Sequence, residues 1–325
     1  MDYIKLIGGL VLLVLSGDYL VKGGVGIATK FKISSLVIGM TVVAFGTSAP
    51  EFLVSLQAAI KGSSAIAVGN VVGSNIANIA LILGATALVS PLIVSGSSIR
   101  KDWPFMMAAS LLFTVAAYNG VISRIEGTIA VALLIAYTAW QIISSRRNYV
   151  ESEDEEVEDT PIWKAALMIV VACLGLTYGA DFLIDGASNI AKSLGVSERV
   201  IGVTIVAFGT SLPELAASIA AAVKKETDIA IGNIVGSNIF NILSVIGMSS
   251  IISPIPVEWA AFRSDFVWMN AIALILILLI LPFRQYFTGK ETHGFLFAQG
   301  KLGRVGGISL LLLYCLYIFL LLTKG

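Results

Sequence analysis

The sequence predicts an all-α polytopic membrane protein with ten transmembrane helices in two inverted five-helix repeats. Three observations predict this fold class. First, 57% of the 325 residues are hydrophobic and only 13% are charged, whereas soluble domains have about 25% charged residues. Second, the apolar residues fall into ten segments. Third, two blocks of the first half recur in the second half. The composition excludes a soluble enzyme and a disordered protein, and the formal net charge of zero argues against nucleic-acid binding.

Each apolar segment is predicted to be one membrane span, because a transmembrane helix needs about 20 residues. The first segment lacks an A-x-A-like cleavage site, so we expect an uncleaved helix and not a signal peptide. The predicted spans are residues 4–21, 33–60, 66–89, 103–119, 127–144, 163–180, 199–223, 229–252, 266–282 and 305–322.

One connection differs from the short loops between the other spans. It carries seven acidic residues between Glu151 and Asp159 and has no apolar periodicity, so it is predicted to be a solvated linker. A calcium-sensing role for these acids is the alternative. The linker, residues 145–161, separates a first repeat of residues 1–144 from a second repeat of residues 162–325.

Lysine and arginine residues set the predicted orientation, because they are retained on the cytoplasmic side of a membrane. With the N-terminus outside, 14 of the 21 basic residues fall in inside loops and 7 in outside positions. Both termini are therefore predicted outside and the linker in the cytoplasm, in a multi-pass protein of the cell (inner) membrane.

The internal repeat has a constant offset of 163 residues. Residues 38–51 and 201–214 are identical at 11 of 14 positions, as are residues 66–79 and 229–242. Five spans per half reverse the second half in the membrane, and inverted repeats are typical of secondary transporters. A duplicated scaffold without a transport role is the alternative, which the polar residues of the repeat disfavour.

Each repeat places a glutamate, Glu51 or Glu214, inside an apolar span, where an unpaired carboxylate is costly and usually functional. Each glutamate follows a proline, which cannot donate a helical hydrogen bond and so frees a backbone carbonyl. A freed carbonyl at this depth is expected to line a cavity or bind an ion. The supporting residues of the two broken helices are the prolines Pro50 and Pro213, the glycines Gly46 and Gly209, and the hydroxyl residues Thr47, Ser48, Thr210 and Ser211.

The second repeated block predicts the opposite wall of the site. Its polar residues recur every four positions and share one helix face; the predicted ligands among them are Ser74, Asn78, Ser237 and Asn241. Asn70 and Asn233 lie on the same face, and for them helix-to-helix hydrogen bonding and ligation remain open. The glycine pairs Gly69-x-x-x-Gly73 and Gly232-x-x-x-Gly236 predict close helix approach.

Two further pairs of polar residues are expected to be structural. Asn75 and Asn238 point about 100° away from the ligand face. Asp18 and Asp181 lie near the ends of spans one and six, where an aspartate can cap a helix, pair with a lysine or line an access path.

The predicted donors are all oxygen atoms, with no cysteine or histidine near them. Such donors exclude zinc and copper and favour a hard cation, Ca2+ or Na+. Two glutamates neutralise one Ca2+, and protonated glutamates also neutralise the site, so protons are plausible counter-ions. The expected partners are Ca2+, Na+ and possibly H+ as transported ions, together with the lipid bilayer. No cofactor, nucleic acid or obligate protein partner is expected.

The paired GTS-x-PE and GN-x-x-GSN-x-x-N blocks resemble the α-repeats of the sodium/calcium exchanger family, within the cation/Ca2+ antiporter superfamily, in its prokaryotic form. The resemblance implies Ca2+ transport coupled to Na+, with spans 2, 3, 7 and 8 as the ion-binding core and spans 1 and 6 sliding across it. Matched residues imply central Ca2+ ligands at Glu51, Glu214, Thr47 and Thr210. They imply Na+ contacts at the carbonyls of Ala44 and Ala207 and at Ser74 and Ser237, with Asn78 and Asn241 flanking the centre.

Two points of function follow from comparing this sequence with that family. The K+-dependent branch places Asp where this chain has Asn241, which argues against K+ dependence. An H+-coupled Ca2+ antiporter would use the same glutamates and remains the alternative. No H-E-x-x-H or G-x-S-x-G motif is present, so no enzyme activity is expected.

Overall fold

A computed structural model describes residues 1–147, 160–195, 209–281 and 299–324. In these residues the chain is helical apart from four very short strands. It divides into two compact units: the first contains Met1–Pro50 and Ser144–Asn233, and the second contains Glu51–Ile143 and Ile234–Gly325. Two of the three divisions fall inside the repeated blocks, directly before Glu51 and directly after Asn233, and the third falls directly before Ser144.

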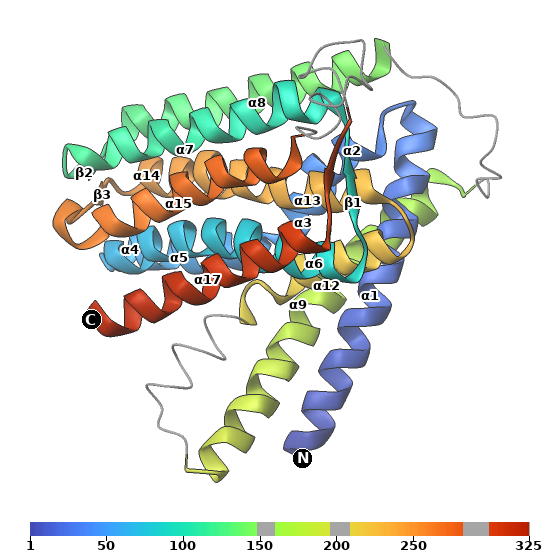
Figure 1. The fold of residues 1–325 in the computed structure, drawn as a ribbon, viewed down its shortest axis with the longest axis horizontal. Coiled ribbons are helices and arrows are strands. Elements are labelled where there is room, and N and C mark those ends of the chain that lie inside the picture. The colour runs from blue at the N-terminus through green and yellow to red at the C-terminus, as the bar shows by residue number, and fades with distance from the viewer. Residues whose placement is uncertain (148–159, 196–208, 282–298, 325) are drawn as a thin grey trace. The chain divides into compact units, whose positions relative to one another are not determined.

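The first unit is built from helices of both repeats (Figure 1). They are α1 (Asp2–Phe31), α2 (Ser35–Ile38), the π-helix η1 (Gly39–Val43), α3 (Ala44–Thr47), α9 (Ile162–Ser193), α12 (Leu212–Val223) and the first half of α13 (Thr227–Phe240).

The second unit contains the remaining elements, except for the first two residues of α4 and the last four of α8, which belong to the first unit. They are α4 (Ala49–Ile60), α5 (Ser64–Ile76), the π-helix η2 (Ala77–Leu83), α6 (Gly84–Val89), β1 (Leu92–Val94), the π-helix η3 (Ser98–Asp102), α7 (Trp103–Tyr118), β2 (Val121–Ile122), α8 (Arg124–Arg147), the second half of α13, the π-helix η5 (Asn241–Ile246), α14 (Gly247–Ile252), β3 (Ile255–Pro256), α15 (Trp259–Ile280), β4 (Gly300–Leu302) and α17 (Arg304–Lys324).

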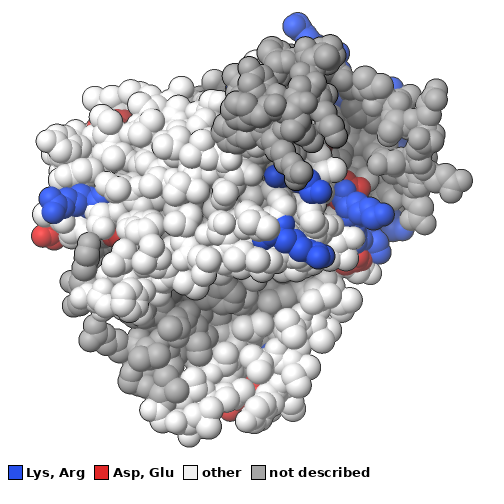
Figure 2. Space-filling view, viewed as in Figure 1, with Lys and Arg blue, Asp and Glu red and all other residues white. Residues whose placement is uncertain are grey.

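Seven helices of the described residues are long and apolar enough to cross a membrane, and the bent α2–α4 segment makes an eighth. Their outward faces expose large apolar side chains such as Ile125 (73%) and Trp163 (68%). Figure 2 shows the same property as a broad white surface of uncharged residues. The chain is therefore a helical, multi-pass membrane protein. Two further predicted spans contain shorter helices, α7 with 16 residues and α12 with 12, and the count of ten stays a prediction.

The span around Glu51 is broken, as its proline predicts. The Ser35–Thr47 and Ala49–Ile60 segments meet at Ser48 with a bend of 51°. Pro50 has no N–H to continue the helical ladder, which accounts for a break at this position. In the second repeat most of the corresponding first segment falls in residues 196–208, outside the described part of the chain, so the matching break before Pro213 stays a prediction.

In the first unit, α1 and α9 lie side by side along most of their length (Figure 1). Small residues allow this approach. A Cβ added at Gly9 would lie 2.7 Å from the carbonyl oxygen of Gly179, and one at Gly23 would lie 2.9 Å from that of Ala165. Close backbone packing through glycine is the usual way in which membrane helices associate, since the bilayer supplies no hydrophobic driving force between them.

One of the four glycines in the two predicted pairs makes a close backbone contact among the described residues. Gly232 of α13 lies against the backbone of α2 and η1 in the first unit: a Cβ there would lie 3.0 Å from the amide nitrogen of Met40 and 3.1 Å from the Cα of Gly39. Among the described residues of the second unit, a Cβ at Gly69 would meet the ring of Phe262 at 3.6 Å, and one at Gly73 has no neighbour within 4 Å. The repeat equivalents of the residues that Gly232 contacts, residues 199–203, lie outside the described part of the chain, so the close approach at Gly69 and Gly73 stays a prediction.

In the second unit, the last helix of each repeat packs against the other repeat, next to its second repeated block. α17 contacts η2 and α6, and Gly307 and Gly84 approach so closely that a Cβ on either would meet the other's carbonyl oxygen at 3.0 Å or less. Gly127 of α8 and Gly247 of α14 make the corresponding contact, at 2.6 and 3.2 Å.

Two short antiparallel ladders join the connections of the second unit. β1 pairs with β4, with Ile93 opposite Lys301, and β2 pairs with β3, with Ile122 opposite Ile255. The all-α prediction did not include them, because strands of two or three residues leave no alternating pattern in the sequence. They satisfy backbone groups between helices.

A buried polar network holds the start of α7 against α8 in the second unit. Asp102 is 2% exposed. Its carboxylate accepts hydrogen bonds from Ser98 Oγ (2.8 Å), Tyr137 Oη (2.8 Å) and Gln141 Nε2 (2.6 Å). The ring of Tyr137 also stacks on Phe105, with centroids 3.7 Å apart. The equivalent aspartate of the second repeat, Asp265, accepts a bond from Tyr317 Oη at 3.3 Å.

Tyr137→Phe is expected to lower the stability of the purified protein by about 1–2 kcal/mol, because it keeps the ring stack and removes one donor from a buried acceptor. Thermal unfolding in detergent measures the loss. Tyr118→Phe is the matched control, since Tyr118 is 69% exposed and should unfold at the wild-type temperature. Equal unfolding temperatures for the wild type and Tyr137→Phe would contradict this role for the network.

Candidate cation-binding site

In the first unit, Glu214 is the centre of a buried polar cluster. It lies in the first turn of α12 and is 1% exposed. Ser48, at the break between α3 and α4, donates its hydroxyl to Glu214 Oε1 at 3.0 Å. The broken span of the first repeat therefore contributes a hydroxyl directly to the carboxylate of the second repeat.

Thr47 and Asn233 complete this cluster. The Thr47 hydroxyl donates to Asn233 Oδ1 at 3.1 Å and lies 3.3 Å from the carbonyl oxygen of Ala44. Asn233 Nδ2 in turn donates to the backbone oxygen of Glu214 (3.3 Å) and to Ser218 Oγ (3.0 Å). Both ends of the Asn233 amide are thus used by the protein, which favours the hydrogen-bonding role over ligation. Because the Thr47 hydroxyl donates its proton to Asn233 Oδ1, the lone pairs of the Thr47 oxygen remain available to a cation.

In the second unit, Glu51 has the equivalent surroundings. It is 1% exposed, and its backbone oxygen accepts from Asn70 Nδ2 at 3.2 Å. Asn70 also donates to Ser55 Oγ at 2.9 Å. Glu51, Ser55 and Asn70 correspond at the offset of 163 to Glu214, Ser218 and Asn233, so the two copies make the same contacts.

Four asparagines form a second buried cluster in the same unit, which we call the asparagine clasp: Asn75, Asn78, Asn238 and Asn241. Asn78 Nδ2 donates to Asn238 Oδ1 at 3.1 Å, and Asn241 Nδ2 donates to Asn75 Oδ1 at 3.3 Å. These bonds are repeat equivalents of one another. The bonds to sulfur are equivalent too, from Asn75 to Met269 (3.9 Å) and from Asn238 to Met106 (3.6 Å).

The backbone of both clasp helices changes to π-helix beside the predicted ligands. Asn78 is the second residue of η2, and Asn241 is the first residue of η5. A π-helical turn is rare and is frequently found at functional sites. The sequence carries no signal for it, since the apolar pattern of a span is the same in either helix.

Several buried oxygen atoms have no hydrogen-bond partner among the described residues. They include Glu214 Oε2 in the first unit, and Ser237 Oγ and Asn241 Oδ1 in the second. A buried acceptor without a partner costs free energy, and a bound cation would satisfy it. The described residues contain no cluster of three or more His, Cys, Asp or Glu side chains, so a cation here would depend on hydroxyl, amide and carbonyl oxygens besides glutamate.

The other predicted ligands have varied surroundings. Ser74 is 6% exposed and Ser211 2%, while Thr210 is half-buried in the turn before α12. The carbonyl oxygen of Ala44 accepts from the Ser48 amide at 3.0 Å, so the helical turn already uses it. Ala207 lies outside the described residues. The two glutamates belong to different units, and their joint site stays a prediction.

Two residues were not predicted from the sequence, Ser55 and Ser218. Each accepts a hydrogen bond from an asparagine that also donates to the backbone oxygen of a glutamate. The signal was present: both serines lie four residues after a glutamate, at equivalent positions of the repeat. Asp18 pairs with two lysines of its own unit, Lys22 at 2.9 Å and Lys224, which matches the lysine-pairing alternative.

Comparison with known proteins relates the whole chain to ion exchangers. The family model described as "Sodium/calcium exchanger protein" matches residues 2–143 and 164–323. The putative antiporter CaxA of Alkalimonas amylolytica is 38% identical over 322 residues, covering 97% of each chain. The sodium/calcium exchanger MaX1 of Methanosarcina acetivorans is 34% identical, covering 86% of this chain and 91% of its own. A solved structure of the sodium-calcium exchanger NCX_Mj, soaked with zero Na+ and Ca2+, has a TM-score of 0.81 at 32% identity and covers 98% of both chains.

Proposed function

Because this chain belongs to the sodium/calcium exchanger protein family, a family of transporters, we propose that it exchanges Ca2+ for Na+ across the cell membrane by alternating access. The observation that carries the proposal is the Glu214 cluster. A carboxylate in a membrane span is buried, bonded on one oxygen by Ser48, and has no hydrogen-bond partner for Oε2 among the described residues. A hard cation such as Ca2+ takes carboxylate oxygens as ligands, so a bound cation would satisfy this oxygen.

The repeat extends the site to the other half. Glu51 corresponds to Glu214 and has the same asparagine and serine partners, so we propose that both carboxylates ligate the transported Ca2+. The remaining proposed ligands are Thr47, Thr210, Ser74, Ser237, Asn78, Asn241 and the carbonyls of Ala44 and Ala207.

The proposed transport cycle rests on ten spans in two inverted repeats. Equivalent residues make equivalent contacts in the Glu51 and Glu214 clusters and in the asparagine clasp, which supports the duplication. In an inverted duplication each half can adopt the conformation that the other half holds, and this exchange exposes the site to each side in turn. The excess of basic residues supports a cytoplasmic linker and termini outside.

We expect the exchange to need Na+ and not K+, because the proposed centre has two carboxylates and an amide at Asn241. Two negative charges neutralise one Ca2+ or two Na+, while the larger K+ would benefit from a third carboxylate. Proteoliposomes loaded with 45Ca2+ should release it into an outer bath of NaCl and retain it in KCl or choline chloride.

Two results would contradict this proposal. Release that requires K+ together with Na+ would refute K+ independence. Release that follows an imposed pH gradient and ignores Na+ would assign the protein to the H+-coupled antiporters, with the glutamates as proton carriers. Liposomes without protein, tested in the same baths, control for leakage.

A further inference from the structure

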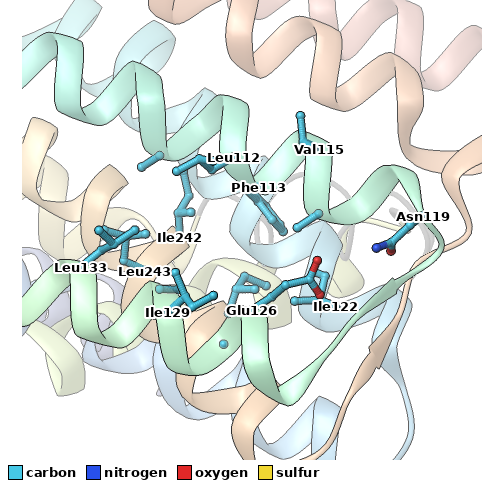
Figure 3. A pocket seen from close by; sticks show the side chains of 15 residues that line it. Leu112, Phe113, Val115, Asn119, Ile122, Glu126, Ile129, Leu133, Ile242 and Leu243 are labelled. Atoms are coloured by element: carbon cyan, nitrogen blue, oxygen red, sulfur yellow. The ribbon is translucent and has the colours of Figure 1, made fainter.

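The second unit contains an apolar pocket that the proposed transport site does not use. Its walls are α7 and α8, its floor is η5, and its volume is about 290 Å3. Figure 3 shows Leu133 at one end of the pocket, Asn119 and Glu126 at the other, and Ile242 and Leu243 between. The floor is thus the π-helical segment that begins with Asn241.

The pocket opens sideways along the lipid-facing surface. Leu112, Val115 and Ile129 line it, and they are 55%, 69% and 53% exposed. In a multi-pass membrane protein, exposed apolar side chains of spanning helices face hydrocarbon. Water is a poor occupant of such a space, because it would find few polar partners there. The volume equals that of about ten water-sized groups at roughly 30 Å3 each, so it suits part of one acyl chain.

An acyl chain alone would gain little from this pocket, because the surrounding lipid is as apolar as the pocket wall. Selectivity therefore has to come from the polar end. Glu126 is the charged residue among those that line the pocket, and Asn119, just after α7, lines it too, with its Oδ1 accepting from the Val121 amide at 3.1 Å. Within the described residues, no lysine or arginine forms an ion pair with Glu126.

The polar end is held in place before any ligand arrives. Glu126 Oε2 accepts from the Ser123 amide (2.7 Å) and hydroxyl (2.8 Å), which fixes the carboxylate at the start of α8. The connection before it turns at Gly120, with φ +89°, and the Gly120 carbonyl accepts from the Val257 amide at 2.8 Å. A rigid carboxylate at the end of an apolar slot matches an amphiphile with a cationic, proton-donating head.

We infer that this pocket binds one acyl chain of a membrane lipid whose head group carries a primary ammonium, with Glu126 and Asn119 receiving that ammonium. Phosphatidylethanolamine has this head group. Phosphatidylcholine has a cation without N–H donors, and phosphatidylglycerol has a net negative head that Glu126 repels. Binding of the lipid is independent of the transport reaction and can be measured without it.

Native mass spectrometry of the delipidated full chain in detergent tests the inference. Each of the three lipids is added with identical acyl chains. The wild type should retain one phosphatidylethanolamine about tenfold more tightly than the other two, a difference of about 1.4 kcal/mol. Glu126→Gln should bring the three affinities to within about twofold, because glutamine still accepts from Ser123 but has no charge.

A second pair of variants tests the chain end of the pocket. Ala116→Phe fills the space between α7 and α8 and should weaken phosphatidylethanolamine binding about tenfold. Ala108→Phe is its matched control, since Ala108 is an exposed residue of α7 that does not line the pocket, and should bind like the wild type.

Three results would overturn the inference: equal affinity of the wild type for the three lipids, a preference that survives in Glu126→Gln, or unchanged binding in Ala116→Phe. Unfolding temperatures show whether each variant is folded. If Ala116→Phe does not fold, the conservative Glu126→Gln still decides.

Discussion

Glu214→Gln is expected to reduce Ca2+ transport by on the order of a hundredfold or more, because the affinity of oxygen sites for Ca2+ depends strongly on ligand charge. The variant removes one of two proposed negative charges, and Ca2+ must lose its hydration shell to enter. Glutamine keeps an oxygen that can accept from Ser48, so the bond that joins Glu214 to the broken span can persist. The fold should therefore survive while 45Ca2+ uptake into Na+-loaded proteoliposomes is lost. Glu51→Gln should have the same effect.

The control for this experiment is Glu258→Gln, which makes the same chemical change at an exposed position before α15. It should transport Ca2+ at the wild-type rate. Thermal unfolding of all the variants separates loss of transport from loss of structure. Uptake near the wild-type level in either Glu214→Gln or Glu51→Gln would exclude that carboxylate from the proposed site.

Gly232→Ala is expected to destabilise the protein by about 1–3 kcal/mol, the usual cost of overpacking a tight interior. A Cβ at this position would press on the backbone of α2 and η1, including the amide nitrogen of Met40 at 3.0 Å. Backbone cannot move aside as a flexible side chain can, so the helices must separate. Measurement of the unfolding temperature in detergent, with the yield of monodisperse protein, shows the effect.

The repeat supplies the matched control. Gly69 is the equivalent of Gly232, but among the described residues a Cβ there meets the Phe262 ring at 3.6 Å, an ordinary contact. Gly69→Ala should therefore unfold at or slightly above the wild-type temperature, because alanine favours helix. Equal loss of stability in Gly69→Ala and Gly232→Ala would show that the backbone contact at Gly232 does not set the cost of the substitution.

The sequence predicted the features that depend on apolar length and on repetition. The multi-pass helical fold follows from composition, the break at Ser48 follows from Pro50, and the grouping of Ser48 with Glu214 follows from the repeated block. Asn75 and Asn238 make hydrogen bonds between helices, as expected of structural residues, but their partners are the predicted ligands Asn241 and Asn78, which the helix-face argument did not anticipate.

Other features could not be predicted, for physical reasons. Gly232 is crowded by the backbone of α2 and η1, and the local sequence around a glycine does not specify which helix will lie against it. In the Asp102 network, the aspartate bonds to residues that lie 35 and 39 positions later in the chain. The equivalent aspartate and tyrosine of the second repeat lie at different offsets from the first, so a search at a single offset misses the network. The π-helical turns at Asn78 and Asn241 leave no trace in hydropathy.

The asparagine clasp has the form of an isologous contact, in which the same two positions of each half meet in a reciprocal way. Asn78 binds Asn238, and Asn241 binds Asn75. Two-fold homodimers make such contacts automatically, and here one chain makes them with itself. Neither half can satisfy its own asparagines in this way. A polypeptide of one half alone would bury amides that lack their partners, unless a second copy of that half supplied them.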